Sequence, residues 1–162
     1  MKKYKWAIIL LNLVLLLLYF NYSVMGKEEI LEEGQLVLLE LAPVDPRSLL
    51  QGDYMDLRYK ISEGIVSENI PKRGYCVVLM DSSGVANKVR FQKAITPLND
   101  GEYLIAYTAP DEWNINIGAE SFFFQEGEAE KYEKAKYGGV KIDKNGNSLL
   151  VGLYDEQLQK IE

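Results

Sequence analysis

The chain has 162 residues, with 18 basic and 24 acidic side chains, a formal net charge of −6, no histidine and one cysteine. The lack of histidine excludes a histidine-based catalytic triad and an imidazole metal ligand. One cysteine cannot form a disulfide or a cysteine zinc site within the chain, and an acidic chain is a poor candidate for binding nucleic acid. We therefore expect no nucleic-acid partner, no metal and no cofactor.

The N-terminal segment is predicted to be a transmembrane helix. Residues 6–26 carry no charge and are mostly apolar, and 21 helical residues rise about 31 Å, which matches the hydrocarbon core of a bilayer. Three lysines precede this span, at positions 2, 3 and 5. The positive-inside bias then places the N-terminus in the cytoplasm and the rest of the chain outside it. We expect a single-pass protein of the cell membrane that contacts the lipid bilayer through residues 6–26.

A cleaved signal peptide is the alternative interpretation of residues 1–26. Its apolar region would be long and no A-x-A cleavage site is present, so an uncleaved signal anchor is favoured. Residues 27–34 (KEEILEEG) are then a charged, helix-favouring linker, and residues 35–162 form one extracytoplasmic β domain. None of the acidic residues lies in residues 1–26, so residues 27–162 hold 15 basic and 24 acidic residues, a net charge of −9.

The external domain is predicted to consist mainly of strands. Alternating or continuous apolar patterns of strand length recur between turn signals. They occupy 36–41, 54–61, 75–80, 85–92, 103–108, 113–117, 140–143 and 148–154. In 54–61 the residues Met55, Leu57, Tyr59 and Ile61 share one face, and Asn-Gly between the last two segments is a strong hairpin signal.

The spacing of these segments predicts a mainly β protein, in which an antiparallel sandwich or partly open barrel with one short helix follows the transmembrane helix. In the segment 85–92 the pattern places Val85, Val89 and Phe91 inward. The helix is expected over 126–136 (EGEAEKYEKAK), where Glu–Lys pairs have a supportive spacing. Residues 121–124 are compatible with the start of this helix or the end of a strand.

One segment, 42–59 (APVDPRSLLQGDYMDLRY), stands out by its turn chemistry. Two prolines stop the preceding strand and fix φ, and Gly52 can adopt a positive φ where the chain enters the next strand. Asp45 and Asp53 can accept hydrogen bonds from nearby backbone amides, and Arg47 can clamp either carboxylate. These residues indicate either a structural corner or a polar site for a partner or ligand.

The same segment carries a resemblance to a known family. Residues 52–59 (GDYMDLRY) match the pattern G-D-Y-x-x-L-x-Y, so the chain resembles the bacterial GDYXXLXY proteins. Residues 42–47 (APVDPR) and 118–123 (GAESFF) are similar to further stretches of that family. The resemblance covers most of residues 30–155. It implies a membrane-anchored bacterial protein of unassigned activity, whose relatives often occur with polytopic membrane proteins.

The candidate residues for binding a ligand or partner are drawn from these motifs, and no catalytic residue is assigned. They are Asp45, Arg47, Gly52, Asp53, Tyr54, Tyr59, Glu120 and Ser121. The leading hypothesis is a membrane-anchored extracytoplasmic accessory or interaction domain that acts with a polytopic membrane protein. Two alternatives remain open: an envelope hydrolase, signal-peptidase-like or carboxylate-based, and a small-molecule sensor domain.

Overall fold

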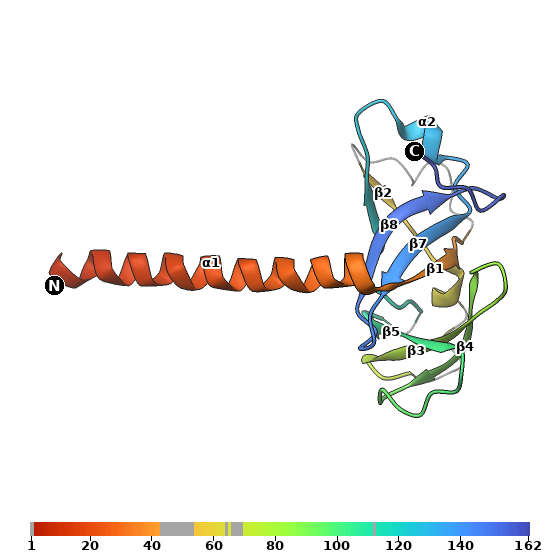
Figure 1. Ribbon diagram of the computed structural model, residues 1–162, viewed down its shortest axis with the longest axis horizontal. Helices are drawn as coiled ribbons and strands as arrows, with labels where there is room; N and C mark the ends of the chain where they lie inside the picture. The colour runs from red at the N-terminus through yellow and green to blue at the C-terminus, as the bar shows by residue number, and fades with distance from the viewer. Residues whose placement is uncertain (1, 43–53, 64, 66–69, 112) are drawn as a thin grey trace.

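The computed structural model describes residues 2–42, 54–63, 65, 70–111 and 113–162. One long N-terminal helix leads into a β domain (Figure 1). The elements in chain order are α1 (Lys2–Glu33), β1 (Gln35–Glu40), β2 (Tyr54–Asp56), the 3₁₀ turn η2 (Lys60–Ser62), β3 (Arg73–Met80), β4 (Ala86–Gln92), β5 (Glu102–Thr108), β6 (Ser121–Phe123), α2 (Ala129–Tyr132), β7 (Tyr137–Ile142) and β8 (Ser148–Tyr154).

Helix α1 is long and apolar enough to cross a membrane. Its 32 residues correspond to about 48 Å at 1.5 Å per residue. The candidate span is Tyr4–Glu33, whose most apolar window has a mean hydropathy of 2.1 and is not buried by any other part of the protein. The helix continues without a break through residues 27–33, so the predicted linker extends α1. These properties fit a single-pass membrane protein.

The C-terminal end of α1 is fixed directly to the β domain. The amide of Gly34 donates to the carbonyl of Ile30 at 3.0 Å, and the Ile30 side chain is buried. Lys141 of β7 donates from Nζ to the carbonyl of Leu31, which satisfies one of the free carbonyls at a helix end. Strand β1 begins two residues after α1 ends, so no flexible connection separates the helix from the sheet.

The strands form three antiparallel sheets with the orders β1-β7-β8, β4-β3-β5 and β2-β6. A parallel bridge between Leu38 and Val85 joins the first two sheets. Both contribute to one hydrophobic cluster, which includes Val37, Val78, Ile105, Val140 and Leu153. In the part of the chain that the structure describes, these sheets do not close into a barrel. The prediction of a mainly antiparallel β fold with one short helix is therefore confirmed.

Several sequence predictions hold at the level of single residues. The segment around Cys76 is the central strand of its sheet, and the thiol is fully buried. The four residues expected to share one face are all buried: Met55, Leu57, Tyr59 and Ile61. Within the segment 54–61, only β2 is regularly paired with another strand. Beyond β2, the chain is held by a bridge between Leu41 and Tyr59 and then by η2.

The segment 113–117 does not form the predicted strand. Only Asn116 pairs with β5, through two backbone hydrogen bonds of 2.8 and 2.9 Å to Thr108. Asp111 accepts the amides of Trp113 and Asn114, which bends the chain before it can align with β5. Gly118 then turns it away at φ 82°.

Val89 was predicted to face inward, and this is wrong because its side chain is 47% exposed. A β-bulge interrupts the pairing of β3 with β4: Val77 pairs with Arg90, whereas Val78 pairs with Lys88. Val89 is the extra residue, and an inserted residue shifts the alternation of the strand by one position. Ala86, before the bulge, is buried instead.

The predicted helix over 126–136 is shortened to the single turn α2. Gly127 adopts φ 86°, which is not a helical conformation. At the other end, the amide of Lys136 donates to the carbonyl of Tyr154 at 2.8 Å, so the chain is already aligned with the sheet. Residues 121–123 form strand β6, which resolves the choice left open for that segment.

An ion pair stabilises the sheet β4-β3-β5 and the loop that follows β4. Arg90 donates to both carboxylate oxygens of Glu102, at 2.5 and 2.8 Å, and also to the carbonyl of Pro97. The amide of Asn99 donates to Glu102 at 2.9 Å. The hydrogen bonds from Arg90, followed by those from Asn99, lower the pKa of Glu102 to about 2.

We predict that this carboxylate makes the fold acid-sensitive. Because the folded-state pKa of Glu102 lies below its ordinary value of 4.5, the group stabilises the fold above that pH, and the stabilisation is lost as the pH falls toward 2. The Glu102→Gln variant should therefore lose less stability between pH 6 and pH 3 than the unsubstituted chain. Urea unfolding of the full chain in detergent micelles, followed by circular dichroism, measures the difference. Equal losses in both chains would contradict the prediction.

Candidate functional site

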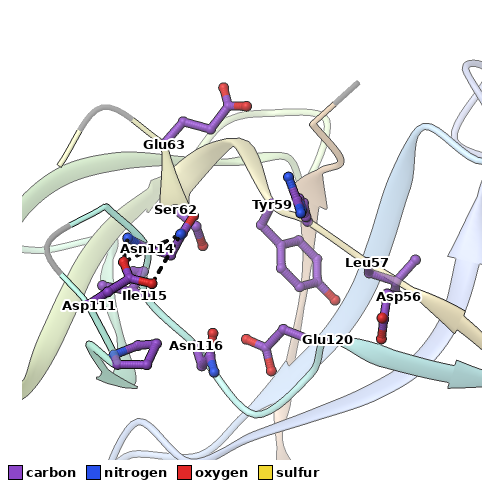
Figure 2. A pocket seen from close by; sticks show the side chains of 12 residues that line it. Asp56, Leu57, Tyr59, Ser62, Glu63, Asp111, Asn114, Ile115, Asn116 and Glu120 are labelled. Atoms are coloured by element: carbon purple, nitrogen blue, oxygen red, sulfur yellow. Dashed lines mark hydrogen bonds between the residues drawn. The ribbon is translucent and has the colours of Figure 1, made fainter. Parts of the chain in front are cut away.

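A cavity of about 360 Å³ lies where the end of the motif segment meets the chain around residues 110–120 (Figure 2). Residues 56–59, the second half of the eight-residue motif, all line it. The lining residues are Asp56, Leu57, Arg58, Tyr59, Ser62, Glu63, Pro110, Asp111, Asn114, Ile115, Asn116 and Glu120. The structure thus brings together two motif segments that are about sixty positions apart in the sequence.

Tyr59 forms the inner wall of the cavity. Its side chain is 1% exposed, and its hydroxyl donates a hydrogen bond of 2.6 Å to the carbonyl of Ala119. Burial, and to a lesser degree the negative charge of Glu120, raise the pKa of Tyr59 far above its ordinary value. The phenol therefore stays neutral and remains a hydrogen-bond donor.

The position of the Tyr59 ring requires a glycine on the neighbouring strand β7. A Cβ atom at Gly138 would lie 2.8 Å from Cε1 of Tyr59, closer than two carbon atoms can approach. The glycine therefore makes room for the ring.

Glu120 organises the part of the lining next to Tyr59. Its carboxylate accepts the backbone amide of Ile117 and, at 3.0 Å, that of Gly118. Its own carbonyl accepts the amide of Leu57 at 2.6 Å. One residue thereby shapes the turn at 117–118 and fastens it to the motif segment. Figure 2 shows both side chains in the lining, with the Tyr59 hydroxyl and the Glu120 carboxylate pointing in different directions.

The rim of the cavity is polar. The carboxylate of Asp111 accepts the amides of Trp113 at 2.8 Å and Asn114 at 2.9 Å. The first of these bonds contributes most to lowering the pKa of Asp111, which keeps this carboxylate ionised and unsuited to donate a proton near neutral pH. Asp56 and Arg58 are exposed at the rim. The cavity can therefore offer both donors and acceptors to a polar group.

The described lining gives little support to nucleophilic chemistry. It contains one serine, Ser62, and no lysine or cysteine among the residues that the structure describes. A serine needs an adjacent base to become an effective nucleophile. A serine–lysine pair of the signal-peptidase type is accordingly not formed by the described residues of this cavity.

A second surface lies on the adjoining strand pair. Tyr54 pairs with Phe123, and Asp56 pairs with Ser121; paired residues, and residues two apart, share one face of a sheet. We call these four residues the β2–β6 outer face. The rings of Tyr54 and Phe123 have centroids 5.9 Å apart, and Phe123 remains 73% exposed.

The predicted site residues are thus divided between two surfaces. Tyr59 and Glu120 lie in the cavity, and Tyr54 and Ser121 lie on the β2–β6 outer face. The remaining candidates lie outside the described residues: Asp45, Arg47, Gly52 and Asp53.

Sequence reasoning missed several residues that belong to these surfaces. Asp56 and Arg58 occupy the variable positions of the motif, but the alternation in 54–61 already placed them on the outward face. Asn114 and Asn116 belong to a segment that was predicted as a strand, and no sequence signal assigned them to the cavity. Phe123 belongs to the aromatic run 122–124, for which the sequence favours packing in the core over an exposed patch, whereas its ring is in fact 73% exposed.

We predict that Tyr59→Phe destabilises the fold although it preserves the shape of the ring. The substitution leaves the buried carbonyl of Ala119 without its donor, which costs about 1–3 kcal/mol in the free energy of unfolding. Tyr54→Phe is the matched control, because the Tyr54 side chain is only half-buried and should change stability by less than about 0.5 kcal/mol. Chemical unfolding of both variants in detergent micelles makes the comparison. Equal effects at the two positions would disprove the role of the Tyr59 hydroxyl.

Comparison with known proteins identifies the family. No curated protein and no solved structure was found to be similar to the chain. The sequence model of the family described as "GDYXXLXY protein" matches residues 16–153, which is most of the chain. This match includes α1 from residue 16, both motif segments and the two walls of the cavity. The chain therefore belongs to the GDYXXLXY protein family.

Proposed function

We propose that this protein is a membrane-anchored extracytoplasmic accessory domain that binds an integral membrane protein through the β2–β6 outer face. The observation that carries the proposal is the exposed aromatic pair of the β2–β6 outer face, in which Phe123 is 73% exposed and its ring lies tilted against that of Tyr54. Aromatic side chains of this kind are enriched among the residues that dominate protein–protein binding.

The surroundings of the pair also suit a protein interface. Asp56 and Ser121 lie beside the aromatic pair on the same face. Arg58, close to Asp56 in the chain, is exposed on the rim of the cavity. Interfaces commonly surround an aromatic centre with a polar rim that pairs with the partner, and arginine is enriched there. The face therefore combines an apolar anchor with hydrogen-bonding groups.

The apolar helix supports a partner in the same membrane. Tethering by α1 would confine the domain to a thin layer beside the bilayer, which raises its effective concentration toward other membrane proteins. At this raised effective concentration, a weak contact through exposed aromatic side chains is sufficient for binding. The resemblance to proteins that occur with polytopic membrane proteins agrees with this choice.

The experiment is crosslinking and affinity purification of the full chain from native membranes. Phe123→Ala should reduce recovery of the partner at least about tenfold, the equivalent of 1.4 kcal/mol. Trp113→Ala is the matched control, because Trp113 is also exposed, at 63%, but lies outside the β2–β6 outer face. Purification of the unsubstituted chain without any membrane protein, or equal losses in both variants, would refute the proposal.

A small-molecule sensor is a second candidate, favoured by the cavity itself. Its volume of about 360 Å³ lies within the range of ligand pockets. A sensor of this kind binds its ligand through the cavity rim, so Arg58→Ala should abolish its response while Phe123→Ala should not. The same pair of variants therefore separates the two functions.

We also propose that the β domain lies outside the cytoplasm. The support is the lysine-rich start of the chain, which favours retention of the N-terminus in the cytoplasm. Alkaline phosphatase fused after Glu162 should be active in cells, whereas green fluorescent protein fused there should be dark. Replacing Lys2, Lys3 and Lys5 by glutamate should weaken this orientation. A fluorescent, phosphatase-negative result for the natural sequence would overturn the assignment.

A further inference from the structure

Two adjoining hollows lie where α1 meets the β domain. The first, of about 430 Å³, is lined on one side by α1 residues Ser23, Gly26, Lys27 and Ile30. Their spacing places them on one face of the helix. The second, of about 510 Å³, is lined by residues from the start of β3 and the end of β5. Both hollows include Ala106, Ile117 and Gly118, so they share a common wall.

The shared wall is held by hydrogen bonds to its backbone. The carbonyl of Gly146, in the turn between β7 and β8, accepts the amide of Ala106 at 2.8 Å. Gly146 has φ 86°, and a Cβ at this position would lie 3.0 Å from the nitrogen of Ala106. Ser148 donates from its hydroxyl to the carbonyl of Ile117. These contacts fix the hollows in place.

The charge of the hollows is opposite to that of the domain as a whole. Their described linings contain three cations, Lys27, Arg73 and Lys93, and no carboxylate. The chain from residue 27 onward holds 24 acidic and 15 basic residues. A concave surface that gathers only positive side chains in an acidic domain is suited to an anion.

The depth of the hollows in the membrane follows from α1. The uncharged residues 6–26 account for about 31 Å, the thickness of the hydrocarbon core, and the headgroup layer adds roughly 5–8 Å on each side. Lys27 is the first charged residue after this span, so it lies at headgroup depth. Ser23 and Gly26 belong to the span and line the first hollow, so the hollow opens toward the headgroups.

We propose that these two hollows bind the phosphate headgroup of an anionic phospholipid from the leaflet beside the β domain. Lys27 meets the headgroup at the membrane surface, while Arg73 and Lys93 extend the positive surface into the second hollow. A lipid is the source of the phosphate because residues of the membrane span form part of the lining. The proposal requires that α1 is inserted in a bilayer, and it does not depend on a protein partner.

The test is native mass spectrometry of the full chain released from micelles that contain equal amounts of phosphatidylglycerol and phosphatidylcholine. The chain should retain phosphatidylglycerol in preference to phosphatidylcholine. Each cation near an anionic headgroup contributes about fivefold, so the double variant Arg73→Gln/Lys93→Gln should weaken this preference about 25-fold. The charge-conserving double variant Arg73→Lys/Lys93→Arg should retain most of it.

A matched pair of lysines serves as the control. Lys134→Gln/Lys136→Gln removes the same charge near α2, outside both hollows, and should leave lipid retention unchanged. Circular dichroism verifies that each variant is folded. Equal retention of the two lipids, or equal losses in the two glutamine variants, would overturn the proposal. Displacement of phosphatidylglycerol by inorganic phosphate at matched concentration, or by a co-purifying protein bound through Arg73 and Lys93, would also overturn it.

Discussion

The arrangement of the β domain depends on the hydrogen bond between the hydroxyl of Tyr59 and the carbonyl of Ala119. Both groups are withdrawn from water, and each would carry a desolvation cost without the other. The bond joins two segments sixty positions apart, and the ring fits only because Gly138 has no side chain. Glu120, next to the acceptor, ties the same segment to Leu57. The last tyrosine of the motif is therefore a structural centre, whereas Tyr54, Asp56 and Arg58 keep surface that can reach a partner.

The connection between α1 and the sheet β1-β7-β8 fixes the direction in which α1 leaves the β domain. A flexible tether would allow the domain to present any face to the bilayer. Here the helix ends against the sheet, with Ile30 buried and the carbonyl of Leu31 bonded to Lys141. The face that adjoins the C-terminal turns of α1 must then lie toward the headgroups whenever α1 spans the membrane. Because of this restriction, the charged side chains around α1 have defined positions relative to the membrane surface. The net charge of the domain does not reveal these positions.

Sequence patterns predicted the features that depend on local interactions. They failed for features that depend on contacts between distant segments. The pattern in 54–61 correctly separated Leu57 and Tyr59 from Arg58, because one side of this segment packs on the core regardless of regular pairing. The alternation around Val89 gave the wrong face for its side chain, because a β-bulge arises from the pairing of two strands. Likewise, Asn114 and Asn116 line the cavity only because Asp111 bends the chain before them. The cavity joins segments that are distant in sequence, so the motifs indicated Tyr59 and Glu120 but not Asn114 and Asn116.

The segment 114–120 links the cavity beside Tyr59 with the hollows next to α1. Asn114 and Glu120 line the cavity beside Tyr59, whereas Ile117 and Gly118 line the hollows next to α1. Glu120 holds the amides of Ile117 and Gly118 with its carboxylate, so the two surfaces share one set of hydrogen bonds. A displacement of Glu120 must therefore alter the turn at 117–118, and a group that occupies the hollows restrains the same turn. The hollows next to α1 and the cavity beside the motif are consequently connected through a few residues, although the motif itself lies far from α1 in the sequence.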